Sequence, residues 1–427
     1  AWVVLGRRTR IMTQHYDSAT MPQFFGARFQ SKALKIGASL IVFIFLIPYT
    51  ASLFNGLSRL FGMAFHMDYT VCIVLMGVLT GIYVVAGGYM ATAINDFIQG
   101  CIMLFGICMV VYAVLHSQGG FTQALHSLAA VSDAATPNGD VPGIFASFFG
   151  PDPLGLLGVV LLTSLGTWGL PQMVQKFYAI KSETAIQKGT VISTLFAFVV
   201  ASGCYFLGGF GRLYGDQIDV ATEGYDAIIP TMLSGLPEIL IAIVVILVLS
   251  ASMSTLSSLV IASSSTLTMD LLKDNVIKDM SDRKSVAIMR FFIVVFVLIS
   301  MIIAIVQYKS SISFIAQLMG VSWGALAGAF LAPFLYGLYW KKATKAACWT
   351  CFVFGAGIMV LDLFCRGMFP TLLQSPINCG AFAMLAGLVI VPVVSLFTRK
   401  PEKTAVEAAF ACYEQKRPVS QTNALEG

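Results

Sequence analysis

Ten apolar stretches, each long enough to cross a lipid bilayer, constrain the fold of this 427-residue chain more than any motif does. A spanning helix needs about 20 apolar residues, and the hydrocarbon core admits only helices and closed barrels. Only 11% of the residues are charged, whereas soluble domains carry about 25%. The mean hydropathy of +0.83 also indicates an all-α, polytopic membrane protein. We expect spans at residues 36–57, 70–88, 94–115, 155–175, 189–211, 239–269, 287–306, 314–338, 346–365 and 377–397.

The positions of Lys and Arg between these spans predict the orientation. Of the 26 basic residues, 22 fall in one alternating set of loops and termini. The other set holds only Arg59, Arg212, Lys309 and Arg366. Cytoplasmic loops carry the excess of positive charge, so we expect a multi-pass cell-membrane protein with both ends of this chain in the cytoplasm. The net charge of +5 follows from the same bias and implies no nucleic-acid partner.

The loops are too short to hold a separate soluble domain. We therefore expect one transmembrane carrier core over residues 1–398 and a loosely ordered cytoplasmic tail over residues 399–427. The chain opens with AWVVLGRRTR, an apolar run that is too short to span and stops at a basic cluster. This pattern predicts the cytoplasmic end of a helix that begins before Ala1.

A face of hydroxyl side chains runs through the span at residues 239–269. Eleven of the 23 residues from Val248 to Asp270 are Ser or Thr. Ala251, Ser254 and Thr255 share one helical face near the bilayer midplane. Oxygen ligands suit a hard cation such as Na⁺. Close helix packing explains the same spacing, so both interpretations remain open at this point.

The span at residues 155–175 contains Gly166, Gly169 and Pro171. Pro removes a backbone hydrogen bond and Gly loosens a helix, so this span is predicted to break. A broken span lines a cavity with free backbone groups, whereas a simple kink does not. Lys176, at its end, is interpreted as a cytoplasmic anchor, although a contact with a carboxylate is also possible.

Several motifs together carry a family resemblance. The stretch SASMSTLSSLVIASSSTLTMDLLK resembles the signature of the sodium/solute symporter family. Further similar motifs follow the family's order: YTASLFNGLSRLFG, GGYMATAINDFIQGCIML, GTWGLPQMVQKFYAIKS and GLYWKKATKAA. The resemblance extends to about residue 398. It implies the inverted-repeat fold of leucine-transporter-like carriers, with the first helices missing from this chain.

The resemblance also implies site residues. A sodium site would use the carbonyl of Ala251 and the hydroxyls of Ser254 and Thr255. Asp96 would act as a further ion residue, although at the start of its span it also suits a helix cap. The broken span would contact the solute. The candidate solute-binding residues are Tyr49, Asn55, Thr163, Thr167, Trp168, Gln172 and Gln317.

The function that the resemblance implies is sodium-coupled import of a small organic solute. A carboxylate or amino acid such as pantothenate, proline or a monocarboxylate is expected, carried by a monomer or weak oligomer in the bilayer. No enzymatic activity is expected. Two alternatives are a proton-coupled carrier and a membrane sensor of the same fold. The hydroxyl face favours Na⁺ over H⁺, and the short C-terminal tail favours a carrier over a sensor.

Overall fold

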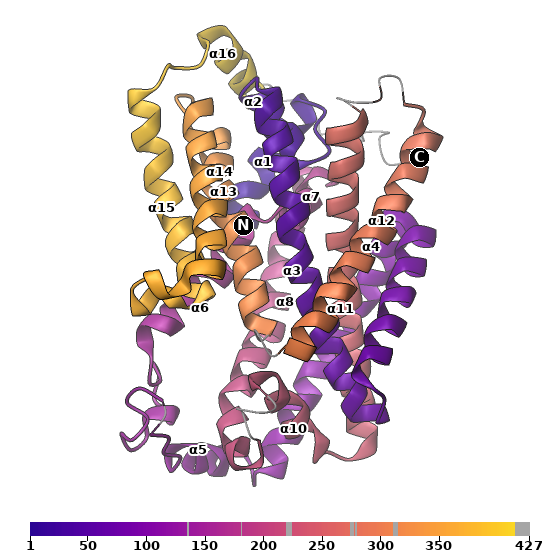
Figure 1. Cartoon of the computed structure of the whole chain (residues 1–427), viewed down its shortest axis with the longest axis vertical. Helices are drawn as coiled ribbons and strands as arrows, with labels where there is room; N and C mark the ends of the chain where they lie inside the picture. Colours follow the sequence, from indigo (N-terminus) through magenta and orange to yellow (C-terminus); the bar gives the residue numbers. More distant parts are fainter. Residues whose placement is uncertain are drawn as a thin grey trace.

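The apolar stretches form helices that run along the long axis of the molecule (Figure 1). The computed structural model describes residues 1–134, 136–180, 182–218, 224–273, 277, 280–310 and 315–414, with all their side chains except those of residues 87–92, 183 and 310. Within these residues, nine helices are long and apolar enough to cross a membrane, and one bent helix pair makes a tenth candidate. The expected all-helical architecture is confirmed, since no strand occurs in this part of the chain.

The long helices are α3 (Lys32–Phe65), α4 (Tyr69–Ser117), α8 (Glu183–Gly209), α11 (Glu238–Ser265), α12 (Asp282–Ser310), α13 (Ile315–Tyr339), α14 (Lys345–Cys365) and α15 (Pro376–Phe397). The shorter helices are α1 (Arg7–His15), α2 (Met21–Arg28), α5 (Phe121–Ala129), α6 (Pro153–Ser164), α7 (Pro171–Tyr178), α10 (Ile228–Ser234) and α16 (Lys403–Ala411). Two π-helical segments, η1 (Trp2–Gly6) and η6 (Thr266–Lys273), adjoin α1 and α11. The 3₁₀ segments are η2 (Ile144–Ala146), η3 (Gly166–Gly169), η4 (Phe210–Gln217), η5 (Tyr225–Ala227), η7 (Arg366–Met368) and η8 (Thr371–Gln374).

Helix α4 contains two of the expected spans and folds back on itself between them. A straight helix of 49 residues would be about 73 Å long, more than twice the hydrocarbon thickness. Asn95 Nδ2 donates a hydrogen bond to the Tyr83 hydroxyl at 2.9 Å, whereas 12 residues of straight helix span about 18 Å. Both ends of α4 therefore lie at the lower end of the molecule. There, Tyr69 stacks on Tyr308 of α12, and Gln118 bonds to a residue of η4.

Helix α13 is the central helix of the bundle. In its most apolar window, 83% is buried, more than in any other candidate span of the described residues. Its neighbours approach it at backbone distance. A Cβ atom on Gly324 would lie 2.7 Å from Cα of Gly380 in α15, and one on Gly355 in α14 would lie 2.3 Å from the carbonyl carbon of Gly328. Small residues permit this close packing, which stabilises helix pairs in lipid.

The break predicted in the span at residues 155–175 is confirmed. Helix α6 continues into η3, and the chain then turns by 45° into α7. Pro171 begins α7, where its missing N–H removes no helical hydrogen bond. Gly169 lies against the central helix, because a Cβ atom there would come within 2.8 Å of the backbone nitrogen of Leu331. The break is therefore held in place by α13.

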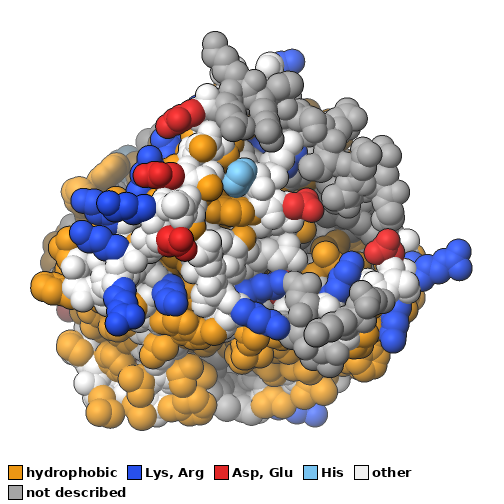
Figure 2. All heavy atoms as spheres, turned by 90° about the horizontal axis from the view of Figure 1, so that it is seen from above, with side chains coloured by type: hydrophobic (Ala, Val, Ile, Leu, Met, Phe, Trp, Pro, Cys, Tyr) orange, Lys and Arg blue, Asp and Glu red, His pale blue; other side chains and the backbone are white. Residues whose placement is uncertain are grey.

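The two ends of the bundle differ in charge. Lys and Arg side chains are spread over the upper face, and apolar side chains crowd part of its edge (Figure 2). The lower end carries α5 and α10 (Figure 1). There, the Asp226 carboxylate accepts a hydrogen bond from the N–H of Ile315 at 3.1 Å and pairs with Arg59 at 3.8 Å. Burial raises the pKa of Asp226, and the Ile315 amide and Arg59 oppose this rise.

The C-terminal segment is more ordered than expected. The sequence predicts a loose tail over residues 399–427, but α16 packs onto the upper end of the bundle (Figure 1). Phe410 is 6% exposed, and the Arg28 guanidinium lies 5.1 Å from its ring centroid. The Tyr413 hydroxyl donates to the carbonyl of Leu338 at 3.3 Å. Residues distant in the sequence thus pack against a segment whose polar composition predicts a loosely ordered tail. Residues 415–427 lie outside the described part.

We expect Gly355→Ala to destabilise the protein, because the new methyl group would press on backbone atoms of α13 that cannot rotate away. Overpacking of this kind typically costs about 1–3 kcal/mol. Gly357→Ala in the same helix is the matched control, since a Cβ atom there meets nothing within 4 Å. Thermal unfolding in detergent compares the two variants. Equal midpoints would contradict the backbone contact between α13 and α14.

Candidate functional site

The hydroxyl face of α11 packs towards α4. Thr255 Oγ1 donates to the carbonyl of Ala251 at 3.0 Å, and Ser258 Oγ donates to the carbonyl of Ser254 at 3.1 Å. Bonds of this kind satisfy the hydroxyl protons and leave oxygen lone pairs for another partner. Ala251, Ser254 and Thr255 are all half-buried. The three residues predicted as sodium ligands therefore lie together on one accessible face.

Asp96 of α4 faces this hydroxyl stripe. Its carboxyl group interacts with the side chain of Ser254, and its Oδ1 atom is buried without a hydrogen-bond partner among the described residues. From the other side, Lys176 Nζ of α7 lies 4.0 Å from Asp96 Oδ2. Three elements far apart in the sequence thus meet at one carboxylate. Carboxylate and hydroxyl oxygens are the ligands that hard cations prefer.

A cavity of about 190 Å³ opens between α4, α7 and α11 beside this carboxylate. Gln172 lines it and is only 3% exposed, yet neither atom of its amide group has a partner among the described residues. An unpaired buried amide costs about 1–3 kcal/mol, so its presence in an otherwise packed helix indicates a binding role. The other lining residues are Ala93, Asp96, Gln175, Lys176, Ser258 and Ile261.

The solute candidates on α3 and α13 lie apart from this cavity. The ring of Tyr49 meets that of Trp323 edge-on, with centroids 5.6 Å apart. Asn55 is buried and donates from Nδ2 to Oε1 of Gln307 in α12. Gln317 is half-buried in the first turn of α13. These three residues do not line the cavity beside Asp96.

The remaining solute candidates lie on the broken span itself. The Thr163 hydroxyl donates to the carbonyl of Val159 at 2.7 Å, and the Thr167 hydroxyl donates to that of Ser164 at 2.9 Å. Trp168 packs against an apolar cluster formed by α13 and α15. Only Gln172, among the seven predicted solute residues, lines the cavity beside Asp96.

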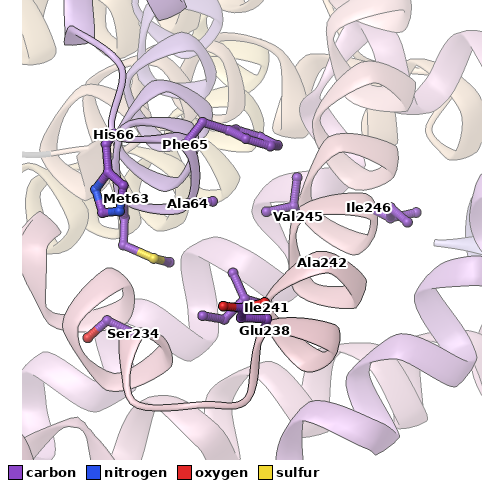
Figure 3. A pocket seen from close by; sticks show the side chains of 10 residues that line it. All are labelled: Met63, Ala64, Phe65, His66, Ser234, Glu238, Ile241, Ala242, Val245 and Ile246. Atoms are coloured by element: carbon purple, nitrogen blue, oxygen red, sulfur yellow. The ribbon is translucent and has the colours of Figure 1, made fainter.

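A second and larger cavity, of about 790 Å³, lies at the lower end, between the last turn of α3, helix α10 and the first turns of α11 (Figure 3). Its lining is mostly apolar and includes the exposed side chain of Phe65. Glu238 and His66 are its only titratable lining residues. None of the predicted site residues lines it, so volume alone does not identify the functional site.

Comparisons with known proteins identify the family of this chain. The sequence model of the family described as "Sodium:solute symporter family" matches residues 1–355. The chain belongs to this family.

The chain is also similar to two curated proteins and to one solved structure. The osmoregulated proline transporter OpuE of Bacillus subtilis (strain 168) is 28% identical over 408 residues, covering 95% of this chain and 79% of the relative. The sodium/pantothenate symporter of Haemophilus influenzae is 26% identical over 359 residues, covering 84% and 71%. A solved structure, titled as the substrate-bound outward-open state of a Na⁺-coupled sialic acid symporter, matches with a TM-score of 0.65 and 16% identity. It covers 94% of this chain and 84% of that chain, and it supports the fold.

Membership in the family confirms several expectations. The chain is a multi-pass membrane carrier for a small solute, Na⁺ is the coupling ion, and the protein is not an enzyme. The assignments of individual ion and solute residues stay predictions. The sequence analysis did not name Gln307, the partner of Asn55. The signal that could have identified it is an amide side chain inside an apolar span. The sequence analysis interprets Lys176 as a cytoplasmic anchor; in the structure its Nζ atom lies 4.0 Å from Asp96 Oδ2.

Replacing Gln172 separates a binding role from a structural one. In the variant Gln172→Leu, a buried unpaired amide disappears at nearly constant volume, so we expect stability to stay equal or to rise by about 1 kcal/mol. We expect uptake to fall at least tenfold, because the cavity loses its amide. Gln118→Leu is the control, since Gln118 bonds to the Tyr214 hydroxyl and its loss should lower stability. Thermal unfolding and uptake by both variants in liposomes test this, and unchanged uptake by Gln172→Leu would remove Gln172 from the site.

Proposed function

We propose that this carrier uses inward Na⁺ flow to import a small solute that bears a carboxylate group. The observation that carries this proposal is that Asp96, which interacts with Ser254, lines one cavity together with the unpaired amide of Gln172. Membership in the sodium:solute symporter family supports the coupling. Relatives named as proline and pantothenate carriers support the solute class, because both compounds are carboxylates.

The proposed sodium ligands fall into two neighbouring groups. Ala251 offers its carbonyl and Thr255 its hydroxyl, and the hydrogen bond between them holds both oxygens on one face. Ser254 and Asp96 form the second group, on the side that faces α4. Their oxygens supply formal charge and dipoles without nitrogen or sulfur ligands. This composition favours Na⁺ over transition metals.

The proposed solute residues surround the broken span and the central helix. Thr163, Thr167 and Trp168 are on the α6–η3 half of the span, and Gln172 is on the α7 half. Tyr49 and Gln317 extend this set to α3 and α13, while Asn55 holds its own position through Gln307. Broken helices place solute sites near the midplane in many secondary transporters, which supports this arrangement.

Coupling requires that ion and solute favour the same conformation of the carrier. Moving one positive charge down 100 mV releases about 2.3 kcal/mol, before any concentration gradient is counted. The break in the span supports a shared conformation, because η3 and α7 connect the proposed solute residues directly to the cavity beside Asp96.

We propose that the upper, basic face lies in the cytoplasm, as the positive-inside rule requires (Figure 2). Both ends of the chain would then be cytoplasmic. The domain division into a carrier core at residues 1–398 and a C-terminal segment is retained, with α16 docked onto the core. We also propose a monomer or weak oligomer, because the central helix α13 is covered by helices of the same chain.

Uptake into liposomes tests the function. The full-length protein is reconstituted, and labelled proline, pantothenate, short monocarboxylates and sialic acid are screened under an inward Na⁺ gradient. In parallel, K⁺ or a proton gradient replaces Na⁺. We expect uptake of one carboxylate only under Na⁺. Uptake that follows pH and ignores Na⁺ would overturn the sodium site and favour the proton-coupled alternative.

Two substitutions test the ion ligands. In Thr255→Ala and in Asp96→Asn, we expect the Na⁺ concentration for half-maximal uptake to rise roughly tenfold, because each removes an oxygen interaction with a cation. The matched control is Thr350→Ala, since Thr350 makes the same backbone bond, to Ala346 at 3.0 Å, on an exposed face of α14. Sodium activation curves in liposomes give the result. Curves that match the control would exclude the substituted residue from the ion site.

A further inference from the structure

The ammonium group of Lys176 lies where the coupling ion would bind. Lys176 is in the last turn of α7, and its Nζ atom is 4.0 Å from Asp96 Oδ2. The Lys176 side chain is 49% exposed and that of Asp96 is 23% exposed. The flexible lysine thus reaches from solvent to a carboxylate that is mostly covered.

This contact differs from an ion pair that holds structure together. Arg212 pairs with Asp133, donates a second bond to Thr136 at 3.0 Å and lies over the ring of Phe145. Among the residues that the structure describes, Lys176 makes one ion-pair contact, at the 4.0 Å limit. A single weak contact made by a long side chain exchanges easily with a dissolved ion.

The surroundings also favour exchange. The cavity of about 190 Å³ adjoins both charged groups, and its lining includes the unpaired amide of Gln172 and the hydroxyl of Ser258. Asp96 Oδ1 is buried and has no hydrogen-bond partner among the described residues, while Oδ2 is the oxygen near Lys176 Nζ. A cation that approaches Asp96 through the cavity therefore meets Lys176, which lines the same space.

We propose that Lys176 is a tethered competitor of Na⁺: its ammonium group neutralises Asp96 in the empty carrier and is displaced when Na⁺ binds. This inference rests on the proposed ion site. Two cations at one carboxylate repel each other, so the lysine must withdraw before Na⁺ is fully bound. It returns as the ion leaves, which lowers the affinity for Na⁺ and speeds its release. The empty carrier then changes conformation without a bare buried charge.

Substitutions at position 176 move Na⁺ affinity in opposite directions. Lys176→Gln removes the competitor, so we expect the Na⁺ concentration for half-maximal uptake to fall about threefold, the scale of a partly exposed ion pair. Maximal uptake should fall too, because release slows. Lys176→Arg strengthens the competitor, since a guanidinium grips a carboxylate with two bonds, and should raise the half-maximal concentration. Lys188→Gln is the control, because Lys188 is an exposed lysine in the following helix, α8.

The measurements are sodium activation of uptake by the full-length protein in liposomes and equilibrium binding of radiolabelled Na⁺ to the purified protein. Opposite shifts for Lys176→Gln and Lys176→Arg, with no shift for Lys188→Gln, would support the competitor. Weaker or unchanged Na⁺ binding in Lys176→Gln would overturn it. Asp96→Asn, measured in parallel, separates a failure of the proposed ion site from a failure of the competitor role alone. If it leaves Na⁺ binding intact, the ion site itself is misassigned; if it weakens Na⁺ binding while Lys176→Gln does not strengthen it, only the competitor role falls.

Discussion

Polar groups inside a bilayer must find their partners within the protein, and the rest of this structure depends on that requirement. Helices satisfy the backbone, so the chain becomes a bundle around α13, whose glycines let α14 and α15 approach at backbone distance. Thr255 and Ser258 of α11 donate their hydroxyl protons to carbonyls of their own helix. Where the backbone leaves the helix at η3, Gly169 presses it against α13.

Two exceptions to this requirement lie close together at the proposed site. Gln172 keeps an unpaired amide and Asp96 an unpaired oxygen, and both border one cavity. The Gln118 amide, by contrast, donates a hydrogen bond to the Tyr214 hydroxyl. Polar atoms that lack protein partners are costly in a membrane protein, so their concentration at one place is a stronger indication of binding than cavity volume. The larger cavity near Glu238 has no comparable group of buried, unpaired atoms on its lining.

Sequence reasoning predicts those features that depend on neighbouring residues. The length of each apolar run predicts a span, and the Gly and Pro residues predict the broken span. Both signals depend only on residues that are close together in the sequence. Features that depend on distant partners could not be predicted in the same way. The contact between Asp96 and Lys176, the pair of Asn55 with Gln307, and the docking of Phe410 on Arg28 all join segments that only the fold brings together. The C-terminal segment is polar in composition, but composition alone does not predict that Phe410 packs against an aromatic and cationic surface.

The broken span connects the proposed ion site and the proposed solute site in one physical element. Its second half, α7, carries Gln172 and Lys176 beside Asp96, while its first half, with η3, carries Trp168 against α13 and α15. A shift of this segment would change both surroundings together, since the two helices are consecutive parts of one span with a 45° break. When two ligands favour the same position of one segment, each raises the affinity for the other by the same factor. An ion that stabilises one position of the segment therefore strengthens the binding of a solute that favours that position. With the sites as proposed, coupling needs no long pathway between them, because a few residues of one interrupted helix contribute to both.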